Sequence, residues 1–142
     1  MEKIALLDTD FAFEYYNNNY NAIQAIASQN FSFIVLSAIT VSEIIRACKD
    51  KRTLQKSIQL LSGDEFLFVN ETISQKSLQL LQQYSLSHNL DISDSLIAAT
   101  AIYYNLYLAT CNTKHFSYIP GLKIINHTVQ PKRKGGGLFG LF

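Results

Sequence analysis

The chain has 142 residues and a mass of 16.0 kDa, which suits one domain that can bury its own core. Apolar residues make up 48% of it, which excludes a disordered chain, and two cysteines exclude a disulfide framework or a four-cysteine zinc site. The formal net charge is +1, with the basic residues scattered and several acids at the ends of predicted elements. That balance suits a metal site that faces a polyanion.

Two strand–helix units are predicted in the first part of the chain. Residues 3–7 form a short apolar run that favours a buried strand. A helix over 11–16 is interrupted by three asparagines at 17–19, and a second helix with one apolar face follows over 20–28. The aromatic and β-branched run at 31–36 predicts the second strand.

The middle of the chain continues this alternation. Residues 40–43 have a capping-box pattern that opens a helix, and apolar spacing continues helical structure to a stop at 62–64. The apolar stripe of its first part consists of Val41, Ile44, Ile45 and Cys48. A short strand is predicted over 66–69, and residues 72–75 form a second capping-box pattern at the start of another helix.

The last elements complete an α/β pattern. Residues 91–94 lead into a helix over 96–104 that is apolar almost all round and is therefore expected to be buried. Strands are predicted over 107–109 and, at an edge of the sheet, over 123–125. Strands that alternate with helices indicate a three-layer α/β/α sandwich with a central, mostly parallel sheet.

We expect one domain over 1–128 and a disordered, basic, glycine-rich tail over 129–142. The N-terminus lacks the apolar core of a signal peptide, and the most apolar stretch, 96–111, is broken by Asn105 and short for a membrane span. The two cysteines are expected to be free thiols. The sequence therefore predicts a cytoplasmic protein with no membrane partner.

Polar side chains lie at several predicted strand-to-helix junctions. They are Asp8 after the first strand, Glu43 one turn into the helix after the second strand, Asp94 in the first turn of the buried helix and Asn112 after a later strand. The carboxyl ends of parallel strands meet at one edge of an α/β sheet, where ligands bind. We therefore expect these side chains to converge.

Three carboxylates in one place would repel one another and raise at least one pKa. A divalent cation removes that repulsion, and Mg²⁺ and Mn²⁺ prefer such hard oxygen ligands. A site of this kind suits phosphoryl chemistry, because the metal lowers the pKa of a bound water and neutralises charge on the phosphate. We therefore expect Mg²⁺ or Mn²⁺ as a cofactor.

Each acid also has a plainer interpretation as a helix cap. Glu43 could complete the capping box with Thr40, Asp94 could cap the buried helix, and Asp8 could cap the helix that follows it. The two roles are compatible, because a capping acid can also bind a metal. Capping alone does not account for the joint placement of the acids.

The spacing of the three histidines does not fit a zinc site. His88 and His127 are expected to be ordinary surface or loop residues. The chain has no GxSxG elbow and no P-loop motif, which excludes the corresponding hydrolase and nucleotide-binding classes.

Four segments, in order, resemble the motifs of the PIN-domain nucleases. They are Asp8-Thr9-Asp10, Thr40-Val41-Ser42-Glu43-Ile44, Asp94-Ser95-Leu96-Ile97-Ala98-Ala99-Thr100-Ala101, and Leu108-Ala109-Thr110-Cys111-Asn112-Thr113-Lys114-His115-Phe116 followed by Ile119-Pro120-Gly121-Leu122. The resemblance covers residues 4–126. Within the family the chain looks most like the VapC-type toxins of toxin–antitoxin pairs.

The resemblance implies a small α/β/α fold and a Mg²⁺- or Mn²⁺-dependent endoribonuclease. It implies that Asp8 and Asp94 are the principal metal ligands and that Glu43 holds a metal-bound water or a second ion. Attack by water would leave a 5′-phosphate on the RNA product. The resemblance further implies a homodimer and a cognate antitoxin that holds the enzyme inactive.

Some positions depart from the family's pattern. Asn112 stands where relatives often have an aspartate, which lowers the charge of the site by one, and Asp10 or Asp91 could compensate. His115 also stands where relatives often have an aspartate, and it could contact phosphate, carry a proton or only cap the last short helix. Further candidates are Thr110 as a supporting residue, and Lys114 and Arg52 as contacts to the RNA backbone.

Two other functional classes remain open. A haloacid dehalogenase-type phosphatase would use Asp8 as a phosphorylated nucleophile and Asp10 as its acid–base, but Ala12 stands where that family has Thr or Val. A catalytically silent PIN-like binding module would keep the fold without metal-dependent cleavage. The charged residues show no base-reading pattern, so the sequence does not identify the RNA.

Overall fold

The computed structural model describes residues 2–130. Its centre is a five-stranded sheet with the strand order β3-β2-β1-β4-β5, in which every neighbouring pair is parallel. The strands are β1 (Ile4–Leu7), β2 (Phe33–Ser37), β3 (Glu65–Leu67), β4 (Tyr107–Ala109) and β5 (Lys123–Ile124). The helices are α1 (Thr9–Tyr16), α2 (Tyr20–Ala27), α3 (Ala38–Ala47), α4 (Lys51–Leu61), α5 (Glu71–His88), α6 (Ile92–Tyr104) and the 3₁₀ turn η1 (Thr113–His115).

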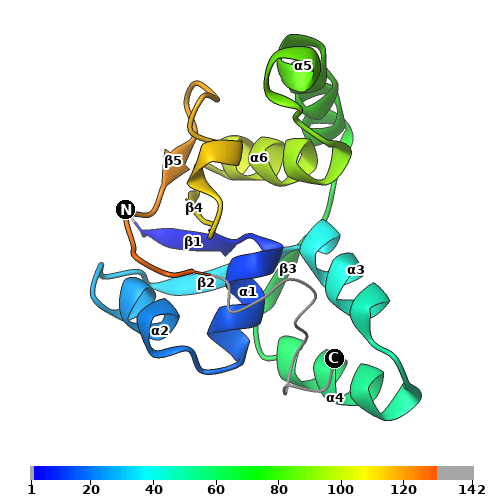
Figure 1. Cartoon of the computed structure of the whole chain (residues 1–142), viewed down its shortest axis with the longest axis vertical. Coiled ribbons are helices and arrows are strands. Elements are labelled where there is room, and N and C mark those ends of the chain that lie inside the picture. The colour runs from blue at the N-terminus through cyan, green and yellow to red at the C-terminus, as the bar shows by residue number, and fades with distance from the viewer. Residues whose placement is uncertain (1, 131–142) are drawn as a thin grey trace.

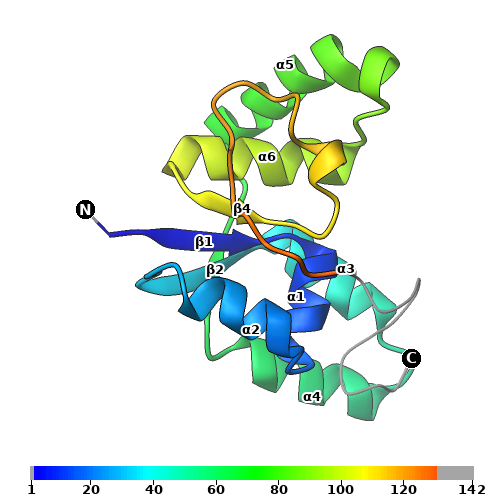
Figure 2. The ribbon, with the colours of Figure 1, turned by 60° about the vertical axis from the view of Figure 1, so that its left-hand side comes forward.

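Helices cover both faces of this sheet, and α1 and α2 lie on the opposite side from α5 and α6 (Figures 1 and 2). The strands are buried on both faces, because alternate residues point to opposite layers. Ala5 and Leu7 of β1 pack with Phe11 of α1, whereas Leu6 packs with Ile97 of α6. The expected three-layer α/β/α sandwich with a parallel sheet is therefore confirmed.

The start of α3 differs from the prediction. Ser37, the last residue of β2, caps the helix by accepting a hydrogen bond from the backbone N–H of Ile39. The expected capping box at 40–43 is therefore wrong, because a hydroxyl already lies at the strand end, three residues earlier. Thr40 is instead inside the helix, where its hydroxyl donates to the carbonyl oxygen of Leu7 in β1 (3.4 Å).

Three further boundaries are shifted from the predicted ones. Asn70 caps α5, so the helix begins before the predicted box at 72–75. The expected continuous helical run after α3 is divided by a short break, and Asp50 caps α4 on its far side. Strand β3 ends before Phe68 and Val69, which are exposed, because its pairing with β2 stops at the end of that strand.

Packing continues past the last strand. The backbone N–H of Ile125 donates to Leu108 O, and Val129 is 1% exposed in the same core as Ile125. The well-packed chain thus reaches Val129, one residue beyond the expected boundary at 128. The remainder of the predicted tail, from 131 to 142, lies outside the described residues. Within residues 2–130, none of the helices combines the length and apolar character needed to cross a membrane.

Candidate active site

The candidate site lies where the strand order changes direction. The chain runs from β1 to β2 and β3 on one side and then returns to place β4 on the other side of β1. Such a switch point leaves a crevice beyond the carboxyl ends of the two central strands. Asp8 follows β1 there, and its backbone N–H donates to Ala109 O at the end of β4 (2.8 Å).

Asp8 is 6% exposed and held from two directions. Its Oδ1 accepts from the backbone N–H of Thr9 (2.9 Å), so it caps α1 as expected, and its Oδ2 accepts from Thr110 Oγ1 (2.9 Å). The pKa of Asp8 is raised to about 6, chiefly by burial; the two hydrogen bonds oppose the rise, and the charges of Asp10 and Glu43 contribute to it. Asp8 therefore caps α1 and also has a carboxyl group whose charged form is disfavoured by burial.

Glu43 reaches the same region from α3. Thr9 Oγ1 donates to Glu43 Oε1 (2.7 Å) and lies 3.2 Å from Thr40 Oγ1, so the carboxylate is turned toward α1 rather than toward its own backbone. The capping interpretation of Glu43 is therefore wrong. Thr9 was not among the residues predicted to support the site. Its place between two aspartates was a usable signal, since a hydroxyl in the first turn of a helix can hold a neighbouring carboxylate.

Asp94 lies in the first turn of α6, and Asp91 is the residue that caps this helix by accepting from the Asp94 backbone N–H (2.8 Å). Burial raises the pKa of Asp94 to about 7, with further contributions from four neighbouring carboxylates. In decreasing order of effect these are Asp8, Asp91, Glu43 and Asp10. These contributions come from acids at the starts of α1 and α6 and within α3, the elements predicted to meet at one edge of the sheet.

Asn112 forms hydrogen bonds to one acid of this group, Asp10, and to Thr110. Its side-chain Nδ2 donates to Asp10 Oδ2 (3.0 Å), and its backbone N–H donates to Thr110 Oγ1 (3.1 Å). Thr110 is fully buried, and its hydroxyl donates a hydrogen bond to Asp8 Oδ2. The supporting candidate Thr110 is thus hydrogen-bonded to Asp8, and the supporting candidate Asp10 is hydrogen-bonded to Asn112.

The family model of the PIN domain matches residues 5–122, which is most of the chain. The chain belongs to the PIN domain family. Membership in this family argues against the haloacid dehalogenase-type phosphatase. A search of curated protein sequences found no significant match.

Solved structures of toxin–antitoxin complexes contain chains with the same fold as this PIN domain. A chain of a Klebsiella pneumoniae toxin–antitoxin complex is 29% identical with a TM-score of 0.70, and the alignment covers 86% of this chain and 96% of that one. A chain of VapBC2 from Rickettsia felis, bound to a promoter DNA fragment, is 28% identical with a TM-score of 0.67, and the alignment covers 85% of this chain and 96% of that one. A chain of VapBC-1 from nontypeable Haemophilus influenzae is 26% identical with a TM-score of 0.71, and the alignment covers 85% of this chain and 96% of that one.

The basic and histidine candidates of this PIN domain differ in how near they lie to the acidic group. His115 Nδ1 lies 3.7 Å from Asp94 Oδ2, and Lys114 precedes it in the same 3₁₀ turn. Arg52 is in the first turn of α4, beside Asp50 rather than beside the acidic group. The structure therefore brings His115 to the acids, whereas the contacts of the described chain do not join Arg52 to them.

His127 is more than the surface residue that the sequence suggested. Its Nδ1 accepts from the backbone N–H of Val129 (2.9 Å), which leaves the proton on Nε2 to be donated to Thr110 O. Its ring packs edge-on against Phe11 with the centroids 5.2 Å apart. His127 thus supports Thr110, which in turn holds Asp8. No spacing in the sequence indicates this, because the contact depends on how the chain returns after β5.

The donor set of this PIN domain fits a divalent cation that keeps most of its water. Within residues 2–130, no group of three or more His, Cys, Asp or Glu side chains is placed so that it could hold a metal ion. Mg²⁺ does not require three such side chains, since it commonly binds one or two carboxylates and several waters. Hard oxygen donors that raise one another's pKa favour such an ion, because its charge removes their repulsion.

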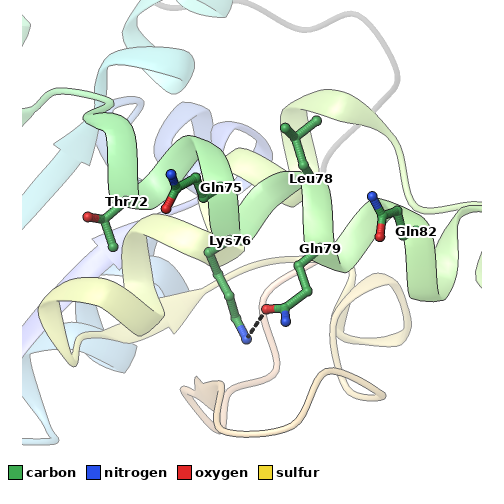
Figure 3. A pocket seen from close by; sticks show the side chains of 6 residues that line it. All are labelled: Thr72, Gln75, Lys76, Leu78, Gln79 and Gln82. Carbon is green, nitrogen blue, oxygen red and sulfur yellow. Dashed lines mark hydrogen bonds between the residues drawn. The ribbon is translucent and has the colours of Figure 1, made fainter.

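A shallow hollow on the outer face of α5 is a different feature. It has a volume of about 570 Å³ and is lined by Thr72, Gln75, Lys76, Leu78, Gln79 and Gln82. Figure 3 shows that these side chains all come from one helix, where Lys76 Nζ donates to Gln79 Oε1 (3.4 Å). It contains no carboxylate or histidine, so it offers no site for metal-dependent chemistry.

Proposed function

We propose that this chain is a Mg²⁺- or Mn²⁺-dependent endoribonuclease and the toxin of a toxin–antitoxin pair. The observation that carries the proposal is the acidic group at the carboxyl edge of the sheet, where the pKa of Asp8 is raised to about 6 and that of Asp94 to about 7. Membership in the PIN domain family and likeness to chains of toxin–antitoxin complexes support it.

In this proposal Asp8 and Asp94 hold the cation, and Glu43 and Asn112 complete the site around it. A divalent cation would supply a water of lowered pKa and a positive charge for the phosphate. Thr110 and the backbone of Thr9 fix the Asp8 carboxylate, so its oxygens cannot turn away from the crevice. Fixed donors of this kind lower the reorganisation that the reaction requires.

Glu43 is the residue that we assign to the attacking water. Thr9 donates to its Oε1, so Oε2 is the oxygen that would orient this water and take its proton, while the departing ribose 3′-oxygen would take a proton from solvent. Because water attacks rather than the ribose 2′-OH, the product carries a 5′-phosphate. His115 and Lys114 lie on the rim next to Asp94, where cationic groups would contact the RNA backbone. Arg52 would contact only a longer RNA that reaches α4.

The proposed partner is an antitoxin that inserts a basic side chain into the acidic group. A cation of either kind, metal or side chain, removes the same repulsion, so the two would compete for one place. The proposal includes a homodimer and a cytoplasmic location, where the RNA substrate is found.

The deciding experiment incubates the purified protein with total cellular RNA in Mn²⁺, in Mg²⁺ and in EDTA. Asp94→Asn is the test variant, and Glu2→Gln is its control, because Glu2 is an exposed acid that precedes β1, at the opposite edge of the sheet. We expect defined fragments that require metal, persist in Glu2→Gln and vanish in Asp94→Asn. Equal fragments from both variants would reveal a contaminating nuclease.

The ends of the fragments test the mechanism separately. Ligation of adaptors that require a 5′-phosphate is expected to succeed without prior treatment. Products with 2′,3′-cyclic phosphate ends would refute attack by water. An absence of cleavage in every lane, together with an absence of metal binding in calorimetry, would favour the silent PIN-like binding module.

A further inference from the structure

Three aromatic rings pack together where the end of α5 meets the loop after η1. His88 lies nearly flat on Tyr118, with the ring centroids 3.9 Å apart and an angle of 19° between the planes. Tyr84, one turn before His88 on α5, packs against both rings, with its centroid 5.7 Å from that of His88 and 5.0 Å from that of Tyr118. His88 is exposed, as the sequence predicted, whereas the two tyrosines are half-buried. The imidazole is therefore the outer ring of this stack.

The ring stack is fixed to the fold on both sides. On α5, the carbonyl oxygen of Tyr84 accepts from the backbone N–H of Leu90 (3.4 Å) just past the helix end. On the other side, Tyr118 lies between Phe116 and Ile119, which are 0% and 4% exposed in the core. A flat surface that is already fixed binds a flat partner with little further loss of side-chain entropy.

The chain connects the ring stack to the candidate active site from two directions. His88 precedes Asp91, the cap of α6, by three residues, and Tyr118 follows His115 by three residues. Three residues span at most about 11 Å. Because His115 Nδ1 lies 3.7 Å from Asp94 Oδ2, the stack is beside the rim that carries the acids and not on a remote face.

The segments that build the stack carry no negative charge. Residues 83–90 and 113–122 contain no Asp or Glu, and their basic side chains are His88, Lys114 and His115. Lys114 is exposed in η1, close along the chain to Tyr118. A nucleotide offers a phosphate for such cationic groups and a flat base for the rings. An apolar peptide would match the rings but not the basic side chains.

We propose that the exposed face of His88, backed by Tyr118, stacks on an unpaired nucleobase of the RNA beside the cleavage site. This rests on the proposed ribonuclease function and adds a base-binding subsite to it. Stacking accepts every base, because every base has an aromatic face. A base inside a duplex has both faces covered by its neighbours. The subsite therefore selects single-stranded RNA without reading its sequence, in a chain whose charged residues show no base-reading pattern.

A comparison of two probes tests this role. Binding is measured in EDTA, where metal-dependent cleavage does not occur, with a mixed-sequence pool of single-stranded RNA about 12 nucleotides long and with a base-free ribose-phosphate oligomer of the same length. His88→Ala is expected to weaken binding of the RNA about tenfold, which corresponds to one stacked base, and to leave binding of the base-free oligomer unchanged. Lys114→Gln should weaken binding of both probes and reduce its salt dependence, because it removes a phosphate contact.

Conservative variants separate the ring from other properties of each side chain. His88→Phe keeps a ring over Tyr118 and should retain most of the affinity for RNA. The Tyr118 hydroxyl oxygen is buried and has no hydrogen-bond partner within residues 2–130, so Tyr118→Phe should also retain most of it. Tyr118→Leu, which removes the ring, should bind RNA as weakly as His88→Ala. Leu86→Ala, at a residue that is 101% exposed near the same end of α5, controls for a change at the helix surface.

Thermal melts first establish that each variant is folded. Equal losses with both probes in His88→Ala would show that His88 acts on the phosphates or on the fold, and wild-type affinity for RNA in that variant would show that no base stacks there. Either result overturns the proposal, as does a wild-type protein that does not bind the RNA pool. Metal-dependent fragments from cellular RNA would then leave the proposed function standing, whereas their absence would refute both.

Discussion

Charged side chains have different surroundings at the two ends of the central strands. At the amino end, Lys3 Nζ donates to Gln29 O (2.9 Å) and lies over the rings of Phe31 (4.6 Å) and Tyr107 (4.9 Å). Lys123 approaches the same tyrosine ring at 4.3 Å. Each cation is therefore paired with an aromatic face or a carbonyl, and these contacts stabilise the fold.

At the carboxyl end, like charges face one another. Burial raises the pKa of Asp8 and of Asp94, and the charges of neighbouring carboxylates, Glu43 and Asp10 among them, add to the effect. An arrangement that lowers the stability of the metal-free protein is expected where a ligand will relieve it, which is why perturbed pKa values mark functional sites. The sheet is therefore stabilised by paired cations at one end, while carboxylates with raised pKa values lie at the other, where we propose that a cation binds.

Asp94→Asn should have the largest effect on this difference between the two ends, because it removes one of the like charges at the carboxyl end. We expect cleavage of RNA to fall by roughly 100-fold or more, since groups that merely support a ligand already account for 10–100-fold. The same variant should melt at a higher temperature than the wild type in EDTA at neutral pH, because one repelling, partly buried charge is gone. Activity assays and thermal melts give the two results. A lower melting temperature would contradict the repulsion inferred for the acidic group.

The pH dependence of stability should have an unusual sign in the metal-free protein. The pKa values of Asp8 and Asp94, about 6 and about 7, lie above their ordinary value of 3.8, so between these limits the folded protein binds more protons than the unfolded chain. The free energy of unfolding should therefore fall as pH rises from about 4 to about 7, with Asp8 contributing up to ~3 kcal/mol.

Urea unfolding in EDTA across that pH range measures the effect, and Mn²⁺ at pH 7.5 should restore stability. In Asp94→Asn the decline should be smaller and should end near the lower of the two pKa values. Stability that rises through the same window would show that the carboxylates are not strained in the folded state.

Thr9→Val tests the support of Glu43 with a smaller change. Valine has nearly the shape of threonine, so the variant removes the hydroxyl that donates to Glu43 Oε1 at 2.7 Å without opening a cavity. We expect cleavage to fall by about tenfold, and stability by about 1 kcal/mol. Thr9→Ser keeps the hydroxyl and should retain most of the activity. An equal loss in both variants would mean that packing of the methyl group, and not the hydrogen bond, is what matters.

Much of the fold could be predicted from local sequence patterns, and the errors in the predicted helix starts have a common cause. The apolar runs of β1, β2 and β4 were predicted because buried parallel strands have uninterrupted hydrophobic sequence. Helix starts were misplaced at α3 and α5 because Ser37 and Asn70 precede the predicted boxes and cap first. Several capping residues can accept hydrogen bonds from the same N-terminal backbone N–H groups, and the local sequence does not determine which of them caps the helix.

The site was predictable in its acids and not in their supports. Asp8, Glu43 and Asp94 could be placed together because strand ends of a parallel sheet share one edge. Thr9 and His127 act through contacts made only after folding, with a carboxylate on α3 and a carbonyl after β4. The place of Thr9 between two aspartates is a sequence signal for such a role, whereas no spacing marks His127, so only the structure identifies that residue.

Lys3→Met examines the amino end, where the smallest effect is expected. Methionine keeps an apolar stem against the rings of Phe31 and Tyr107 but removes the charge and the hydrogen bond to Gln29 O. We expect a loss of about 1 kcal/mol in urea unfolding and unchanged RNA cleavage. Because β1 joins Lys3 directly to Asp8, a loss of cleavage at unchanged stability would mean that the strand transmits changes between its ends. Unchanged cleavage would mean that the two ends are energetically independent, as their opposite treatment of charge implies.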